Sequence, residues 1–241
     1  MLASALEVPD IAAHSPGEID WDALPDGFLV AMHWHRTPVL QEILKKKKAE
    51  VLVTVRHPLD VLISILRFCQ FEPATARWLD GEGGNEAVLL GADPTDSRFL
   101  QYALSDRVAA LLSVSLEWRR EAKVIVHYEK LVDDRYQTLS GVLNAVGESP
   151  LQSLQDAIAS YELGRLKAIT GRHCWLGRPG VWRFVLVDEY RRAIYQRHRD
   201  VFDSFGYAVE PTLLSDQECR DNWNKLLASE SHPEASGAAP E

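Results

Sequence analysis

Apolar and polar residues follow one another along the chain in a pattern that predicts short strands separated by helices. Three apolar runs have the length and composition of buried strands: residues 28–32, 51–55 and 124–128. Helical periodicity is expected over residues 39–48, 59–70, 99–118, 137–146, 151–161 and 188–205. Strands that are apolar on both faces are typical of a parallel sheet. We therefore expect an α/β protein whose parallel sheet is flanked by helices.

The two ends of the chain lack such patterns. Pro9, Pro16 and Pro25 stand too close together for a long helix, so residues 1–27 are expected to form an irregular or weakly helical lead-in. From residue 228 onward Ser, Pro, Ala and Glu dominate, which predicts a disordered tail over residues 228–241. The remaining length suits a single α/β domain within residues 1–227.

Charge and cysteine content narrow the function classes. The 241 residues carry a formal net charge of −9, which argues against a nucleic-acid binder because that role needs a broad basic face. A small anionic ligand is still compatible with this net charge, because a few local cations can hold it. Cys69, Cys174 and Cys219 lack metal-ligand spacing and leave one thiol unpaired, so we expect reduced cysteines in a cytoplasmic protein, and no metal site. No apolar stretch is long enough for a membrane span, and no secretory signal opens the chain.

Arg56 directly follows the most strand-like run, and parallel α/β sheets bind ligands beyond the carboxyl ends of their strands. Its planar guanidinium can hold a phosphate through two parallel hydrogen bonds. Ser64 comes eight residues later, well inside the following helix, and can add a hydroxyl donor. The structural alternatives are an ion pair between Arg56 and Asp60, and a hydrogen bond from Ser64 to the carbonyl of Asp60.

The segment of residues 51–64, Val-Leu-Val-Thr-Val-Arg-His-Pro-Leu-Asp-Val-Leu-Ile-Ser, resembles the 3′-phosphate-binding segment of the sulfotransferase family. In that family a strand ends in Arg, a turn and an Asp-Val pair follow, and a Ser comes at the same spacing. The resemblance implies a P-loop NTPase-like fold and 3′-phosphoadenosine 5′-phosphosulfate (PAPS) as co-substrate. It further implies sulfuryl transfer to a hydroxyl acceptor without a metal, with Arg56 and Ser64 holding the 3′-phosphate.

Residues 35–38, His-Arg-Thr-Pro, follow the first predicted strand and are similar to the family's Thr-His-Leu-Pro-Pro. The resemblance implies that His35 is the general base on the acceptor hydroxyl. An imidazole suits this task because its pKa lies near neutrality. His33 lies on the same face of the strand and is the competing choice, and we prefer His35. The structural alternative is a pair of polar strand-end histidines without a catalytic part.

Two tyrosines are similar to family residues that contact the adenine nucleotide. Tyr128 and Glu129 close the third strand as in the family's Tyr-Glu-Asp-Leu segment, whose Tyr touches the cofactor. Tyr161 follows Ser160, which resembles more weakly the family's Ser-Phe segment near adenine. The alternatives are a tyrosine that caps the sheet for Tyr128 and a core aromatic at a helix end for Tyr161.

Residues 171–182 resemble the family's Arg-Lys-Gly-x-x-Gly-Asp-Trp loop, which wraps the 3′-phosphate. Gly177 and Gly180 match the pattern, but apolar residues stand where the family has Arg, Lys and Asp. The resemblance implies that Arg178, or else Arg172, supplies the missing cation, while the glycines let the backbone approach the anion. An ordinary Gly-Pro surface turn is the structural alternative.

The family's first strand and its Pro-Lys-Ser-Gly-Thr-Thr loop, which cradles the 5′-phosphosulfate, have no counterpart in residues 1–27. By the family's spacing this loop would fall before Met1, so the chain is expected to be N-terminally truncated relative to the family. One anion-stabilising donor of this kind is worth about 10²–10³ in rate. The loop therefore decides whether such a chain is active.

Three hypotheses follow. The preferred one is a PAPS-dependent sulfotransferase with a small-molecule hydroxyl acceptor, whose pocket would include residues 71–98, and without nucleic-acid or membrane partners. The second is a catalytically impaired, truncated relative that acts as a nucleotide-binding or interaction module. The third is a nucleoside or nucleotide kinase, against which the absence of a phosphate-binding Gly-x-x-x-x-Gly-Lys-Ser/Thr loop counts. Asp60 and Asp133 also lie too far into their segments to hold Mg²⁺ at a strand end.

Overall fold

The computed structural model describes residues 1–74, 76–77, 84–148, 152–162 and 175–231. The chain divides into two compact units, each built from two separate stretches. The first unit comprises Met1–Arg56 and Ala110–Pro179, and the second comprises His57–Ala109 and Gly180–Glu241. The single domain expected over residues 1–227 stays a prediction.

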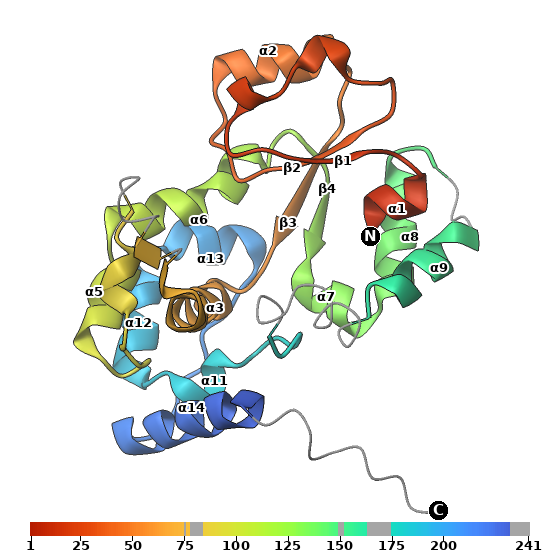
Figure 1. The fold of residues 1–241 in the computed structure, drawn as a ribbon. Coiled ribbons are helices and arrows are strands. Elements are labelled where there is room, and N and C mark those ends of the chain that lie inside the picture. The colour runs from red at the N-terminus through yellow and green to blue at the C-terminus, as the bar shows by residue number, and fades with distance from the viewer. Residues whose placement is uncertain (75, 78–83, 149–151, 163–174, 232–241) are drawn as a thin grey trace, which may run out of the picture. The chain divides into compact units, whose positions relative to one another are not determined.

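The described strands all belong to the first unit and pair in parallel (Figure 1). Strand β1 (Asp10–Ala12) pairs with β2 (Leu29–Ala31), and β3 (Val51–Val55) pairs with β4 (Ala122–His127). In the β3–β4 pair, Val55 lies opposite His127. The α/β class with parallel pairing is confirmed. Among the described residues, however, the strands form two separate two-stranded sheets instead of the one sheet expected.

Strand β1 lies inside the lead-in that was expected to be irregular. It is only three residues long, so it carries no periodicity that a sequence pattern can detect, and it forms by pairing with β2. The rest of this stretch consists of short turns of helix: α1 (Leu2–Leu6), η1 (Pro16–Glu18) and η2 (Trp21–Ala23). The expectation for residues 1–27 was therefore wrong at β1.

The helices of the first unit begin where local chemistry favours them. Helix α2 (Pro38–Lys46) starts with Pro at its first position, and the Thr37 hydroxyl oxygen accepts from the Leu40 amide at 3.2 Å. Helices α7 (Tyr128–Asp133) and α8 (Arg135–Ala145) follow β4 and contact it. Helices α1, α8 and α9 (Gln152–Ser160) bury one apolar cluster, made of Ala5, Leu139, Leu143, Leu154 and Ala157.

The second unit is helical in its described part. Its central helix is α3 (Pro58–Phe71), which buries apolar residues on most of its sides, as expected from its composition. Around it are η3 (Glu86–Leu89), α5 (Ser97–Ala103), α11 (Trp182–Val185), α12 (Asp188–Arg197), α13 (Arg199–Phe205) and α14 (Asp216–Ser231). Helix α11 packs against both α3 and α14. Helix α6 (Asp106–Trp118) has residues in both units.

Two helices that the sequence pattern joined are each broken in the structure. Residues 99–118 were expected to be one helix, but α5 ends at Ala103 and the Ser105 hydroxyl accepts from the Val108 amide at 3.3 Å at the start of α6. The helix expected over residues 188–205 is interrupted at His198, whose Nε2 lies 2.7 Å from the Ala103 carbonyl oxygen. The expected end near Gly206 is confirmed by its left-handed backbone, with φ 71°.

The tail prediction was wrong for its first residues. Helix α14 continues to Ser231, three residues past the expected start of disorder at Ala228. Its Trp223 is buried, and this contact with the unit, rather than local composition, keeps the segment helical. Residues 232–241 lie outside the described residues.

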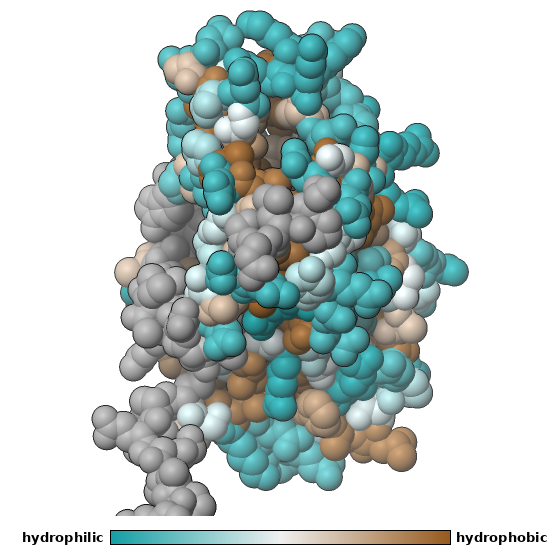
Figure 2. All heavy atoms as spheres, turned by 90° about the vertical axis from the view of Figure 1, so that its right-hand side faces the viewer, coloured by the Kyte–Doolittle hydropathy of each residue, from teal (hydrophilic) through white to brown (hydrophobic). Residues whose placement is uncertain are grey.

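The surface carries few large apolar groups. Figure 2 shows hydrophilic residues over much of one face, with apolar residues in smaller groups among them. The large apolar side chains exposed in the described residues are Val39, Tyr136, Phe184 and Leu213. None of the helices in the described part of the chain combines the length and apolar content needed to cross a membrane. Cys69 and Cys219 are free and buried, and Cys174 lies outside the described residues.

Candidate nucleotide-binding site

Arg56 and Tyr128 meet at the carboxyl ends of two paired strands. Arg56 is the first residue after β3, and Tyr128 is the first residue after β4. Because Val55 lies opposite His127 in the register, the next residue of each strand lies side by side with its counterpart. The Arg56 guanidinium carbon lies 4.6 Å from the centroid of the Tyr128 ring, a cation–π contact. The structure thus brings together two of the predicted nucleotide-binding residues.

The Arg56 guanidinium has one nitrogen without a hydrogen bond in the described structure. Its Nε is buried and has no hydrogen-bond partner in the part of the chain that the structure describes. A buried donor left without a partner destabilises the folded state by about 1–3 kcal/mol, so native proteins rarely tolerate one without a function. The ion pair proposed as the structural alternative therefore does not satisfy this nitrogen. An anionic ligand at the end of β3 would do so.

His35 lies in the segment that follows β2 and is held by a carboxylate of α6. Its Nδ1 lies 2.9 Å from Glu117 Oε1, and about half of the His35 side chain (51%) is exposed. A carboxylate only accepts hydrogen bonds, so Nδ1 carries the proton and Nε2 of the neutral ring carries the lone pair. This is the protonation form that a general base needs. The competing residue, His33, is exposed.

Glu117 is ionised at neutral pH in this environment. Burial by itself raises the pKa of Glu117, but the hydrogen bonds from the Arg36 amide, His35 and the Ser113 hydroxyl together hold that pKa below its ordinary value. No motif or pattern in the sequence singles out Glu117. It is 82 positions from His35, and a pairing over that separation leaves no local signal.

Three further predicted residues lie in the first unit. The Tyr161 hydroxyl lies 3.4 Å from the Ser4 hydroxyl, so its described polar contact is with α1. Gly177 has a positive φ of 62°, which favours glycine, and Arg178 is exposed. The alternative cation, Arg172, lies outside the described residues. The roles of these residues stay predictions.

In the second unit, Asp60 anchors the loop that contains Gly180. Asp60 is 1% exposed, and its carboxylate accepts from the Gly180 amide at 2.6 Å and from the Trp182 amide at 3.3 Å. The Gly180 amide is therefore engaged by a side chain of this unit. Ser64 is half-buried on α3, one helical turn beyond Asp60 and so on the same face.

His57 caps α3, a role that the sequence pattern did not reveal. Its Nδ1 accepts from the Leu59 amide at 3.3 Å and so caps α3. Its ring stacks on Trp182 with 4.6 Å between centroids, and its Nε2 lies 3.1 Å from the Ala208 carbonyl oxygen. The His-Pro dipeptide is thus a structural corner of the second unit.

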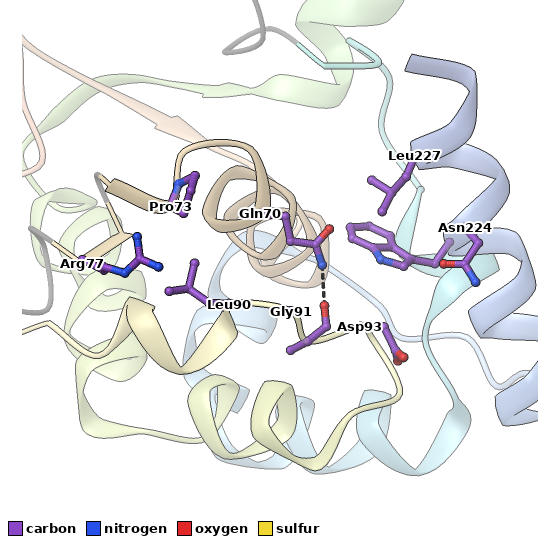
Figure 3. A pocket seen from close by; sticks show the side chains of 10 residues that line it. Gln70, Pro73, Arg77, Leu90, Gly91, Asp93, Asn224 and Leu227 are labelled. Atoms are coloured by element: carbon purple, nitrogen blue, oxygen red, sulfur yellow. Dashed lines mark hydrogen bonds between the residues drawn. The ribbon is translucent and has the colours of Figure 1, made fainter. Parts of the chain in front are cut away.

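A pocket among the described residues lies elsewhere in the second unit. It has a volume of about 550 Å³ and is lined by the C-terminal end of α3, the loop at residues 90–93 and α14. Figure 3 shows Gln70 at its centre, donating a hydrogen bond to the backbone at Ala92. The lining includes none of the residues predicted individually for the site, but Pro73, Arg77 and residues 90–93 lie in the stretch 71–98 where the acceptor pocket was expected. That expectation stays a prediction, because the volume of a pocket does not identify its ligand.

A comparison with solved structures supports the fold. The chain is similar to the crystal structure of mouse sulfotransferase SULT7A1 complexed with PAP, with a TM-score of 0.57 and 17% sequence identity over 91% of this chain and 79% of that chain. The chain has a sulfotransferase-like fold. At this identity the likeness concerns the fold alone. No protein-family model matches the chain, and no curated protein matches it in sequence.

The described residues contain no group of three or more His, Cys, Asp or Glu side chains that could hold a metal ion.

The sulfotransferase-like fold agrees with the fold that the resemblance implied, while the assignments of individual residues stay predictions.

Proposed function

We propose that this protein binds 3′-phosphoadenosine nucleotides and transfers the sulfuryl group of PAPS to a hydroxyl acceptor. The observation that carries the proposal is Arg56, a guanidinium at the carboxyl end of β3 whose buried Nε has no hydrogen-bond partner among the described residues. The resemblance of residues 51–64 to the 3′-phosphate segment of sulfotransferases and the sulfotransferase-like fold support it.

In this proposal some residues bind the nucleotide, and His35 carries out the proton transfer. Arg56 holds the 3′-phosphate through its planar fork, and Tyr128 supports the guanidinium from one face. The nucleotide-binding roles that the resemblance gives to Ser64, Tyr161, Gly177, Arg178 and Gly180 stay predictions of this proposal. His35 removes the proton of the acceptor hydroxyl at Nε2. The acceptor oxygen then bonds to sulfur while the bond between sulfur and the 5′-phosphate oxygen breaks, and adenosine 3′,5′-bisphosphate leaves.

Calorimetric titration with adenosine 3′,5′-bisphosphate tests the binding step. We expect the wild-type chain to bind with a Kd on the order of micromolar. Arg56→Ala should abolish this binding. The matched control is Arg199→Ala, which removes an exposed arginine whose side chain pairs with Asp203. A folded wild-type chain that does not bind the nucleotide, or an Arg56→Ala variant that binds equally well, would refute the proposal.

A second candidate is a nucleotide-binding module without turnover. The described residues before β2 favour it, because β1 is followed by the short 3₁₀ turns η1 and η2 and not by a glycine-rich loop that opens a helix. Incubation with sulfur-labelled PAPS and a panel of phenols and alcohols separates the two candidates. Label in an acceptor supports the transferase, whereas nucleotide binding without labelled product supports the module.

A further inference from the structure

We infer that Glu117 is a positioning residue that holds the His35 ring with Nδ1 protonated and so presents Nε2 to the acceptor. The catalytic meaning of this inference rests on the proposed function. The contact between Glu117 and His35 lies within the first unit, and the position of the ring proton can be measured without any catalysis.

Both oxygens of Glu117 bind the same short stretch of chain. Oε1 accepts from His35 Nδ1 at 2.9 Å, and Oε2 accepts from the Arg36 backbone amide at 2.9 Å. One carboxylate therefore restrains a ring and the backbone immediately after it. The ring cannot rotate about its side-chain bonds without losing the first contact, and the backbone cannot shift without losing the second.

The carboxylate is itself held in place. The Ser113 hydroxyl, one turn earlier on α6, donates to Glu117 Oε1 at 3.0 Å. The next residue of α6, Trp118, is buried and donates from its indole Nε1 to the Trp34 carbonyl at 2.9 Å. Two consecutive residues of one helix thus clamp three consecutive residues, 34–36, of the segment after β2.

The clamp selects one of the two neutral forms of His35. A histidine in water divides its proton between Nδ1 and Nε2, and only the Nδ1–H form leaves Nε2 able to accept a proton. An ionised Glu117 beside Nδ1 favours that form, and it also stabilises the imidazolium that results when the ring takes the acceptor's proton. Arrangements in which a base is oriented by a third group recur in enzymes that activate hydroxyl groups.

Glu121 provides a matched control. It lies four residues after Glu117, and its Oε1 accepts from the side chains of Arg36 and Gln41 instead of from His35. A substitution there removes the same charge from the same region and leaves the contact between Glu117 and His35 intact.

The test is a nitrogen-detected NMR experiment on the full chain labelled with ¹⁵N-histidine, with His35 assigned through a His35→Gln variant. We expect the neutral His35 ring of the wild type and of Glu121→Leu to carry its proton on Nδ1. In Glu117→Leu the Nε2–H form should become the major one. If the leucine variant does not fold, Glu117→Gln serves instead, and there a mixture of the two forms is expected.

The inference would be overturned by a wild-type His35 that carries its proton on Nε2, or by a Glu117→Leu variant with the wild-type proton distribution. Where transfer is measurable, Glu117→Leu should lower kcat at least about tenfold and leave the nucleotide Kd unchanged, while Glu121→Leu keeps the wild-type kcat. Equal kcat values in the wild type and Glu117→Leu would also contradict it. A wild-type chain with the Nδ1–H form but without nucleotide binding would count against the proposed function alone.

Discussion

The segments that follow β2 and β3 satisfy their polar groups in opposite ways. After β2, His35 and the Arg36 amide donate to Glu117, and Trp118 of the same helix donates to the Trp34 carbonyl, so the protein itself holds the His35 ring. After β3, the buried Nε of Arg56 has no partner among the described residues. A completed environment fixes the direction of a side chain, whereas an incomplete one leaves binding energy for a ligand.

This contrast concerns stability as well as function. A satisfied group contributes to the folded state, and its removal destabilises the protein. An unsatisfied buried donor contributes little or is unfavourable, and its removal is tolerated until the ligand is added. Substitutions at the two strand ends should therefore separate stability from binding.

The largest effect is expected for Arg56→Met, which keeps the length of the side chain and removes the guanidinium. Affinity for adenosine 3′,5′-bisphosphate should fall by about 10²–10³, because a bidentate charge-assisted contact is lost. The midpoint of thermal unfolding should change little, since the Nε of Arg56 has no hydrogen-bond partner among the described residues and a methionine can still pack on the Tyr128 ring. Calorimetry measures the affinity, and a thermal melt measures the midpoint. A sharp drop in the midpoint would show that the folded state itself depends on the guanidinium and would remove the contrast.

The second effect is expected at Asp60, the satisfied buried charge of the second unit. Asp60→Ala leaves the Gly180 and Trp182 amides without their acceptor. We expect the free energy of unfolding to fall by about 3 kcal/mol, measured by urea denaturation. A loss below about 1 kcal/mol would mean that water replaces the carboxylate and that the anchor is not needed for folding.

Tyr128 should have a smaller effect that depends on its ring. Tyr128→Phe keeps the aromatic face beneath the Arg56 guanidinium, whereas Tyr128→Leu removes it. The leucine variant should bind adenosine 3′,5′-bisphosphate about 3- to 10-fold more weakly than the phenylalanine variant, the value of one cation–π contact. Equal weakening in both variants would assign the effect to the hydroxyl group instead.

The smallest effect is a pH dependence at Glu117. Its pKa lies below the ordinary value of 4.5, so its hydrogen bonds contribute fully above that pH and are lost as the pH falls through the lowered pKa. The difference in unfolding free energy between wild type and Glu117→Gln, on the order of 1 kcal/mol because Glu117 is one-third exposed, should shrink on acidification from about pH 6 to about pH 3. A difference that stays constant over this range would contradict the prediction.

Strong local patterns in the sequence were sufficient to predict β3 and α3. The β-branched run of β3, the proline that opens α3 and the apolar surface of α3 predicted both elements almost to the residue. The same segment placed Arg56 at the end of a strand, and the run before Tyr128 placed that residue at the end of the neighbouring one. Their proximity followed from parallel pairing and was observed.

Elements that depend on distant partners were not predictable in the same way. Strand β1 is too short to show a period, and the last residues of α14, 228–231, open a stretch whose composition is typical of a disordered tail. The break at His198 coincides with a contact to the Ala103 carbonyl, 95 positions away. In each case long-range contacts outweigh local preference.

The sequence by itself determined the residue types that can do the proposed chemistry and the strand ends that carry them, because strand runs and turns are encoded by neighbouring residues. Only the tertiary structure decided that Glu117 holds His35 and that the Nε of Arg56 has no hydrogen-bond partner in the described part of the chain. Whether a polar group is satisfied depends on atoms that approach it in space, and for His35 those atoms lie 82 positions away along the chain.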